Sequence, residues 1–308
     1  MRIITTGNAH LDIDAYGGIV AYAELLNLQG HAAQAVSTAQ QNESIPPSLR
    51  KWKVAFSNAY AASPEDTFTL IDISEPQYID NFVEPERVDE VIDHHPGYEE
   101  YWHDLIGEKA DIEPIGASCT QIYERWEKAG KLKKISKESA GLLMSGILDN
   151  TLNFGAKITN QRDRHAYSEL AKYAGLPEDW PAHYFGEIQK NIGSDPVHAV
   201  KSDTKIIDEF PSRMNPLTVG QAAIWDAKQL LADYQDALVT AFDADSSEWF
   251  INIISISEGR SYFICANPKL RSWVAELLGV VFDDELAISD RMWLRKEMVR
   301  QDIDRSAA

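Results

Sequence analysis

Carboxylate and imidazole side chains follow three apolar segments in the first half of the chain. The first segment, RIITT, leads into GNAHLDID, the second is FTLID, and the third is VIDHH. Polar side chains at the end of an apolar run are costly to bury unless something binds them. The candidates at these three places are Asn8, His10, Asp12 and Asp14; then Asp72; then Asp93, His94 and His95.

These residue types together suit divalent metal ions. Asp149, after the apolar run LLMSGIL, is a further candidate. Carboxylates gathered at one place raise one another's pKa unless a counter-charge is present. Mixed Asp and His ligands without thiolate favour Mn²⁺, Mg²⁺, Fe²⁺ or Zn²⁺ over Ca²⁺. Two such ions can activate a water and stabilise attack on phosphorus. Taken singly, each motif is also compatible with a helix cap, a surface histidine pair or a polar helix end.

The strands and helices expected around these residues place all three polar segments at one edge of a sheet. Residues 2–6, 67–73 and 88–92 have strand patterns, and residues 15–28, 119–128 and 137–148 have helical spacing. This alternation is typical of a mainly parallel α/β sheet with helices on both faces. Ligands of such sheets bind outside the carboxyl ends of the strands, where all three polar segments would lie.

The second half predicts a smaller α/β domain. The segment IQKNIGSDPVHAVKS is polar and contains Gly193 and Pro196, which indicates a linker. We therefore expect domains at residues 1–188 and 201–308, joined by a linker at 189–200. In the second domain, residues 221–238 and 270–278 are expected to be helical, and residues 249–256 and 262–266 to be strands.

Composition and charge argue against a nucleic-acid-binding protein and against a membrane protein. The net charge of −19 over 308 residues argues against stable binding to nucleic acid or to an anionic membrane. No apolar run reaches the ~18 residues of a membrane helix, and no signal-peptide pattern is present, so we expect a cytoplasmic protein. The two cysteines, Cys119 and Cys265, are expected to be buried thiols.

The order of these motifs resembles the DHH phosphoesterase superfamily. The matching parts are DID at 12–14, the strand-end Asp72, DHH at 93–95, IEPIGASCTQIYERW at 112–126, and Asp149. The second half resembles the DHHA2 domain of manganese-dependent (family II) inorganic pyrophosphatases and exopolyphosphatases. The resemblance implies two α/β domains with the active site in the cleft.

The resemblance also implies a metal role for most of the candidates. Two divalent ions are expected, Mn²⁺ first and Mg²⁺ or Co²⁺ as alternatives, with Asp72 bridging them. Asp12 would bind one ion, while Asp14, His94 and Asp149 would bind the other.

The remaining candidates would act on the substrate. The resemblance implies that His95 is a phosphate ligand or proton donor and that Asp93 supports the two histidines. In the second domain, it implies that phosphate is bound by Lys205, Arg295 and Lys296.

Two positions depart from the family pattern. Asn8 stands where the pyrophosphatases carry a histidine, so either Asn8 or His10 would complete the first metal site. Glu297, in LRKEM, stands where the family motif SRKKQ has a lysine. Both changes would weaken pyrophosphate hydrolysis.

The resemblance implies hydrolysis of phosphoanhydride bonds in inorganic pyrophosphate or short polyphosphate by a hydroxide that two metal ions activate. The alternatives are an exopolyphosphatase for longer chains, a phosphodiesterase for short oligonucleotides or cyclic dinucleotides, and a binding protein with a weakened metal site. The small phosphate substrate is the expected partner of a monomer or homodimer.

Overall fold

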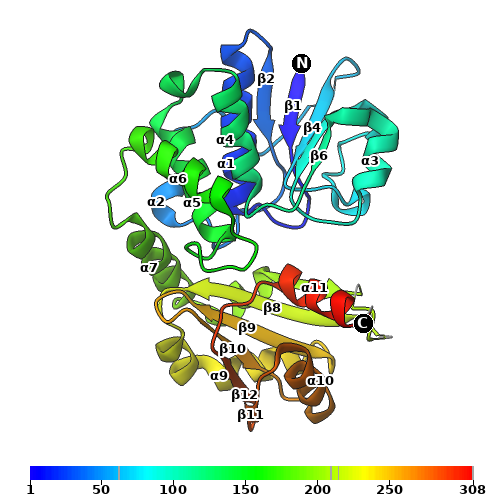
Figure 1. The fold of residues 1–308 in the computed structure, drawn as a ribbon, viewed down its shortest axis with the longest axis vertical. Helices are drawn as coiled ribbons and strands as arrows, with labels where there is room; N and C mark the ends of the chain where they lie inside the picture. Colours follow the sequence, from blue (N-terminus) through cyan, green and yellow to red (C-terminus); the bar gives the residue numbers. More distant parts are fainter. Residues whose placement is uncertain (62, 209, 214, 307–308) are drawn as a thin grey trace. The chain divides into compact units, whose positions relative to one another are not determined.

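The computed structural model describes residues 1–61, 63–208, 210–213 and 215–306. The chain divides into two compact units. Unit 1 comprises Met1–Phe154 and Ile158–Trp180, and unit 2 comprises Gly155–Lys157 and Pro181–Ala308. Each unit is built on its own six-stranded sheet (Figure 1). The predicted α/β fold with a second sheet domain is therefore confirmed.

The sheet of unit 1 is parallel throughout, in the order β3-β2-β1-β4-β5-β6. The strand order reverses at β1, which has β2 on one side and β4 on the other. Such a switch point is where open α/β sheets bind ligands. The strands are β1 (Arg2–Thr5), β2 (Ala33–Val36), β3 (Phe56–Ser57), β4 (Thr67–Ile71), β5 (Val88–Asp93) and β6 (Ala110–Ile112).

Helices cover both faces of this sheet. They are α1 (Ile13–Leu28), α2 (Pro47–Arg50), α3 (Glu99–Ile106), α4 (Ser118–Lys128), α5 (Lys137–Asn150) and α6 (Gln161–Ala174). Figure 1 shows α1, α4, α5 and α6 gathered on one side of the sheet, with α3 on the other. On the α3 side, the buried Trp102 packs in one apolar cluster with Phe68 and Val91.

Helices α1 and α5 approach each other closely because both carry glycine at the contact. A Cβ on Gly17 would lie 2.9 Å from the carbonyl oxygen of Leu142, and one on Gly146 would lie 3.1 Å from Cα of Asp14. A larger side chain at either position would force the helices apart. The glycines therefore bring α5 directly against the first turn of α1.

The sheet of unit 2 is mixed, in the order β11-β12-β10-β9-β8-β7. Its β8–β9 pair is parallel, and its other pairs are antiparallel. The strands are β7 (Thr204–Ile207), β8 (Leu217–Ile224), β9 (Trp249–Ser255), β10 (Arg260–Ile264), β11 (Phe282–Asp283) and β12 (Leu286–Ser289).

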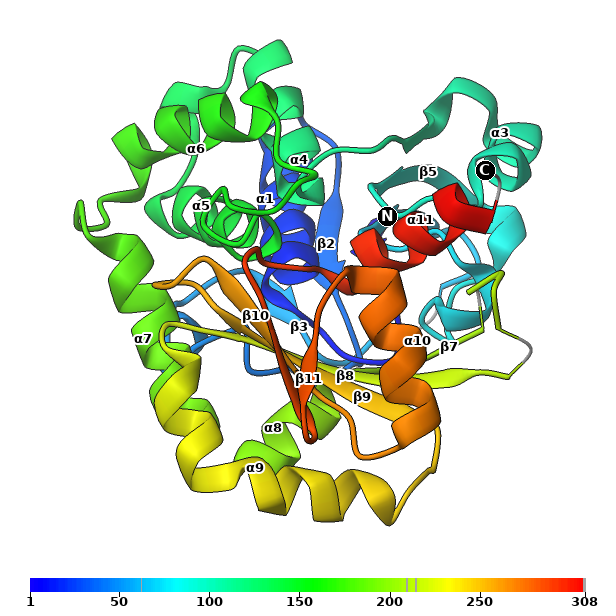
Figure 2. The same cartoon turned by 60° about the horizontal axis from the view of Figure 1, so that its bottom comes forward.

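The helices of unit 2 lie on both faces of its sheet. They are α8 (Pro196–Ser202), α9 (Ala227–Asp243), α10 (Pro268–Leu278) and α11 (Arg295–Ser306), preceded by α7 (Trp180–Ile192). Helices α8 and α9 cover one face, and α10 and α11 cover the other (Figure 2). Cys119 in unit 1 and Cys265 in unit 2 are buried free thiols, as predicted. No helix among the described residues is long and apolar enough to cross a membrane.

The structure adds detail at one segment of the sequence analysis and differs from it at another. Residues 189–200 are mostly the end of α7 and the start of α8, because Asp195 caps α8 by accepting a hydrogen bond from the His198 amide and Pro196 occupies its first turn. Residues 221–224 are the end of β8 rather than helix. The alanines of this segment favour helix locally, but pairing with the buried strand β9 overrides that preference.

Candidate metal centre

Asp72 is held in a fixed orientation at the end of β4. Its backbone has φ = 60°, a left-handed conformation that residues other than glycine seldom adopt. Its amide donates to the carbonyl oxygen of Ile92 at 2.9 Å, and the Ser118 hydroxyl donates to its Oδ1 at 2.8 Å. Such a conformation persists where the surroundings fix it, and it is common at functional sites.

Asp14, in the first turn of α1, faces the start of α4. Its side chain is fully buried, and its oxygens accept hydrogen bonds from the backbone amides of Ser118 and Cys119 at 2.9 and 2.8 Å. The amides at a helix N-terminus carry partial positive charge and stabilise a carboxylate. Asp14 is therefore oriented by two fixed backbone donors.

The tautomer of His94 is set by the backbone. Nδ1 lies 3.1 Å from the carbonyl oxygen of Ile115, which can only accept, so Nδ1 carries a hydrogen. Nε2 lies 3.3 Å from Oδ1 of Asp72 and 3.8 Å from Oδ2 of Asp14. This geometry is favourable if the ring is protonated or if a cation lies between the three groups. An Nδ1–H bonded to a carbonyl is a usual arrangement of a metal-binding histidine.

Asp93 organises the turn that carries both histidines. Its Oδ1 accepts from the backbone amides of His94 and His95 at 2.7 and 3.2 Å, and it lies 2.8 Å from Nδ1 of His95. Burial raises the pKa of Asp93, but the charge and hydrogen bonds of His95 outweigh burial and hold the pKa below its ordinary value. The His95 side chain remains 31% exposed, so it can meet a solute.

Two carboxylates of the cluster have raised pKa values. Burial, reinforced by the charge of Asp12, raises the pKa of Asp14 to about 6. Burial and the charges of Asp14, Asp12 and Asp93 raise the pKa of Asp72 well above its ordinary value. In the part of the chain that the structure describes, none of these four carboxylates pairs with Lys or Arg.

A divalent cation fits this donor set. Single ligand atoms of Asp72, His94 and His95 lie within 4.8 Å of one another. A cation placed among them would offset the repulsion that raises the carboxylate pKa values, and it would accept the lone pair of a neutral His94. The structure therefore brings together predicted residues that come from different strand ends.

Asp12 and Asp149 lie on α1 and α5, the two helices that meet at Asp14. Asp12 is the N-cap of α1, and its Oδ1 accepts from the Ala15 amide at 2.9 Å. Asp149 is half-buried near the end of α5, about one turn beyond Gly146. Because Gly146 lies against Asp14, the helix that carries Asp149 packs on the cluster.

Asn8 and His10 lie in the loop between β1 and α1. The Asn8 side chain donates through Nδ2 to the carbonyl oxygen of Ile79 at 3.0 Å, which leaves Oδ1 as the acceptor atom of the amide. His10 is half-buried and is not in the compact group of ligand atoms found among the described residues. Of the two side chains, that of Asn8 has the defined anchor.

The three predicted phosphate ligands lie in unit 2. The guanidinium of Arg295 forms an ion pair with Asp203 and bonds the carbonyl oxygen of Val219 at 3.3 Å. Lys205 is exposed on β7, where it pairs with Val219 in the strand register. Lys296 is half-buried in the first turn of α11. Lys205 and Arg295 thus lie beside the same residue of β8.

Glu297 has a structural role that the sequence did not predict. Its carboxylate is nearly buried, pairs with Arg291 at 3.2 Å, and accepts from the Leu294 amide at 3.4 Å, just before α11 begins. A carboxylate at this position satisfies an amide that the helix leaves without a partner. Glu297 therefore stabilises the start of α11, and its charge is offset by Arg291.

The supporting residues of the metal centre were missed by sequence reasoning. Ser118 and Cys119 contribute backbone amides, Ile115 contributes a carbonyl oxygen, and Gly146 contributes the absence of a side chain. The signal was the run IGAS, in which small residues precede an amphipathic helix. Small residues let a helix N-terminus approach a ligand, but the run does not say which ligand.

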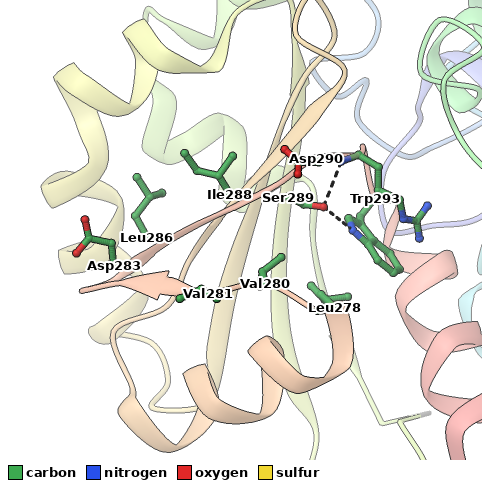
Figure 3. A pocket seen from close by; sticks show the side chains of 11 residues that line it. Leu278, Val280, Val281, Asp283, Leu286, Ile288, Ser289, Asp290 and Trp293 are labelled. Atoms are coloured by element: carbon green, nitrogen blue, oxygen red, sulfur yellow. Dashed lines mark hydrogen bonds between the residues drawn. The ribbon is translucent and has the colours of Figure 1, made fainter.

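A separate cavity of about 700 Å³ lies in unit 2, between the end of α10 and the hairpin of β11 and β12. Figure 3 shows apolar side chains such as Leu278, Val280 and Ile288 in its lining. The Trp293 indole and the Arg291 amide both donate to the hydroxyl of Ser289. Trp293 also belongs to the apolar core of unit 2. The residue types of this cavity do not resemble those of the metal centre.

Known proteins are similar to this chain in sequence. Residues 2–147 match the family described as "DHH family, N-terminal domain". A Lactobacillus gasseri protein described as "Probable manganese-dependent inorganic pyrophosphatase" is 25% identical over 287 residues, which is 91% of this chain and 86% of the relative. A Bacillus cereus protein of the same description is 32% identical over 180 residues, 58% of this chain and 57% of the relative.

A solved structure has the same fold. It is described as "Crystal structure of Methanococcus jannaschii putative family II inorganic pyrophosphatase", with a TM-score of 0.74, 17% identity, and 99% coverage of both chains. Residues 2–147 are therefore similar to DHH family N-terminal domains, and the chain is similar, over most of its length, to proteins described as probable manganese-dependent inorganic pyrophosphatases.

Proposed function

We propose that this chain is a metal-dependent hydrolase of phosphoanhydride bonds, with inorganic pyrophosphate or short polyphosphate as substrate. The observation that carries the proposal is the cluster of Asp14, Asp72 and His94, in which two buried carboxylates and an imidazole nitrogen converge without a Lys or Arg among the described residues. The descriptions of the relatives support the substrate class.

The proposed metal set has two ions, with Mn²⁺ as the first candidate and Mg²⁺ or Co²⁺ as alternatives. Asp72 would be a ligand of both ions. Asp12, with Asn8 or His10, would hold one ion, and Asp14, His94 and Asp149 would hold the other. When bound, divalent ions supply a water that is nucleophilic at neutral pH and offset the charge of phosphate oxygens.

The protein's own residues supply orientation and protons. The amides of Ser118 and Cys119 fix Asp14, and the carbonyl oxygen of Ile115 fixes the ring of His94. Asp93 holds His95 through Nδ1, which leaves Nε2 to contact a phosphate oxygen or to deliver a proton to the leaving phosphate. Fixed groups of this kind need no rearrangement as charge develops on the phosphate.

Three cations of unit 2 are the proposed phosphate ligands. Lys205 and Lys296 bind phosphate oxygens, and Arg295 exchanges part of its bonding with Asp203 for a bond to phosphate. Guanidinium groups bind carboxylate and phosphate in the same bidentate way, so the exchange conserves the number of hydrogen bonds.

The experiment is a measurement of phosphate release with Mn²⁺ and, separately, with Mg²⁺. The substrates are pyrophosphate, tripolyphosphate, long polyphosphate and pApA, the last coupled to a phosphomonoesterase. We expect pyrophosphate or tripolyphosphate to be turned over fastest. Preference for long chains would indicate an exopolyphosphatase, and release only from pApA would indicate a phosphodiesterase. No release from any substrate would contradict the proposal.

A further inference from the structure

Asp80 is a buried carboxylate that the proposed reaction does not use. Its residue is 2% exposed. Its Oδ2 accepts from the backbone amide of Thr38 at 2.9 Å, and both of its oxygens lie 2.9 Å from the Thr38 hydroxyl. Over the described ranges, no Lys or Arg pairs with it. Burying a carboxylate without a cation opposes folding, so its retention calls for another explanation.

The segment around Asp80 supports one end of the loop between β1 and α1. The Asp80 amide donates to the carbonyl oxygen of Thr6 at 3.2 Å. The Asn8 amide donates to the carbonyl oxygen of Tyr78 at 2.8 Å, and Nδ2 of Asn8 donates to that of Ile79 at 3.0 Å. Residues 78–80 therefore determine where Asn8 lies.

The segment that follows Thr38 supports the other end of the same loop. The Leu11 amide donates to the carbonyl oxygen of Gln40 at 2.8 Å, and the Asn42 amide donates to that of Leu11 at 3.0 Å. Leu11 directly precedes Asp12, the N-cap of α1. Residues 40–42 therefore determine where the loop enters α1 and where Asp12 lies.

We propose that Asp80 is a positioning residue of the metal centre. By bonding Thr38, it ties the two supports of the loop to each other and fixes Asn8 and Asp12 at the spacing that the first metal ion requires. This positioning matters because the Asn8 side chain is neutral and attracts a cation only weakly. Its amide oxygen can therefore serve as a ligand only if the protein holds it in place. This inference rests on the proposed function.

Three substitutions test the inference. Asp80→Ala removes both bonds to Thr38, and Thr38→Val removes only the hydroxyl donor. Asp66→Ala is the matched control: Asp66 is also a buried carboxylate of unit 1, and it accepts from the Met1 amino group and the Tyr60 hydroxyl, each at 2.8 Å. Asp66 directly precedes β4, so it lies at the sheet edge opposite the metal centre.

The measurement is a Mn²⁺ titration of the full chain after chelator treatment, in which free Mn²⁺ is followed by electron paramagnetic resonance. Thermal unfolding in chelator reports stability separately. We expect Asp80→Ala to weaken the binding of one Mn²⁺ ion about 10- to 100-fold, the range seen when a group that orients metal ligands is removed. Thr38→Val should weaken it less. Raising the Mn²⁺ concentration should restore phosphate release by Asp80→Ala.

The control separates positioning from stability. Asp66→Ala should lower the unfolding temperature and leave Mn²⁺ affinity unchanged. The inference is wrong if Thr38→Val and Asp80→Ala bind Mn²⁺ like the wild type, or if Asp66→Ala weakens binding equally. Should Asp80→Ala not fold, Thr38→Val decides alone. A wild-type chain that binds no Mn²⁺ would overturn the proposed function, and the inference with it.

Discussion

The two units of this chain differ in how their charged candidate residues are compensated. In unit 1, Asp14 and Asp72 are buried side by side, and their pKa values are raised because burial and neighbouring carboxylates oppose ionisation. In unit 2, Arg295 already has a counter-ion in Asp203, and Lys205 is exposed to solvent. Unit 1 therefore buries carboxylates that no Lys or Arg among its described residues neutralises, whereas these two candidate phosphate ligands of unit 2 are stable without a bound anion.

Sheet topology explains the difference. All strands of the unit 1 sheet are parallel, so their carboxyl ends meet at one edge and deliver Asp72, Asp93 and the loop of Asp12 to one place. In unit 2, most neighbouring strands are antiparallel, so successive strand ends fall on opposite edges. A parallel sheet concentrates polar strand ends, and a mixed sheet distributes them.

The largest predicted effect comes from neutralising Asp72. Asp72→Asn keeps the shape of the side chain and removes a charge to which the proposed metal ions bind. We expect phosphate release to fall by more than about 100-fold, beyond the effect of losing a supporting group. In chelator, the same variant should unfold at a higher temperature than the wild type, because it no longer buries a carboxylate beside Asp14 and Asp12.

The metal-bound proteins should show the reverse order of stability. With Mn²⁺ present, the wild type gains stability from metal binding that Asp72→Asn loses. Thermal unfolding of both proteins, with chelator and with Mn²⁺, makes the test. If Asp72→Asn hydrolyses pyrophosphate as fast as the wild type, the charge of Asp72 is not needed for a metal ion. The contrast drawn between the two units would then be wrong.

Gly146 tests how closely α5 must approach the cluster. Gly146→Ala would place a Cβ 2.6 Å from Sγ of Cys119 and 3.1 Å from Oδ1 of Asp14. We expect a loss of about 1–3 kcal/mol in the free energy of unfolding, together with weaker Mn²⁺ binding. The control is Gly186→Ala in α7, where a Cβ would meet nothing within 4 Å.

The control should be neutral or stabilising by up to about 1 kcal/mol, since alanine favours helix over glycine. Chemical denaturation and Mn²⁺ titration of both variants provide the comparison. Equal behaviour of the two variants would mean that α5 can move without cost to the metal centre.

The cations of unit 2 should affect substrate binding more than turnover. Lys205→Gln should raise KM for pyrophosphate about 3- to 10-fold at low salt, with kcat and stability little changed, because Lys205 is exposed. Lys269→Gln, at an exposed lysine of α10, is the matched control and should leave KM unchanged. Steady-state kinetics at two salt concentrations provide the measurement. A KM unchanged in Lys205→Gln would remove this residue from the phosphate site.

The smallest predicted effect on activity is that of Glu297→Lys, which restores the residue type of the related motif. Because Glu297 pairs with Arg291 and bonds the Leu294 amide, we expect a loss of about 1–3 kcal/mol in the free energy of unfolding and a KM change below about twofold. Steady-state kinetics and chemical denaturation of this variant make the test. A variant that is as stable as the wild type and binds pyrophosphate much more tightly would show that Glu297 weakens the phosphate site after all.

The fold and the centre of the site could be predicted because each depends on strong local patterns. The apolar runs that end in Asp72 and Asp93 identify strands, and alternation with helices predicts a parallel sheet. Parallel strands then place these residues at one edge. The left-handed backbone of Asp72 could not be predicted, because it depends on contacts with Ile92 and Ser118, which are distant in sequence.

Other features that the sequence did not reveal have the same origin. Residues 221–224 have helical propensity, but strand pairing outweighs it. The contacts of Glu297 with Arg291 and with the Leu294 amide depend on how the chain folds before α11. The support of Asn8 by residues 78–80 is likewise invisible in the sequence, because it consists mainly of backbone hydrogen bonds.

The most direct test of the central claim is the number of Mn²⁺ ions that the full chain binds at equilibrium, counted by dialysis for the wild type and for Asp72→Asn. The account predicts two ions per wild-type chain and fewer for Asp72→Asn, because Asp72 is proposed as a ligand of both ions. A wild-type chain that binds no Mn²⁺, or an Asp72→Asn chain that binds as many ions with equal affinity, would contradict it.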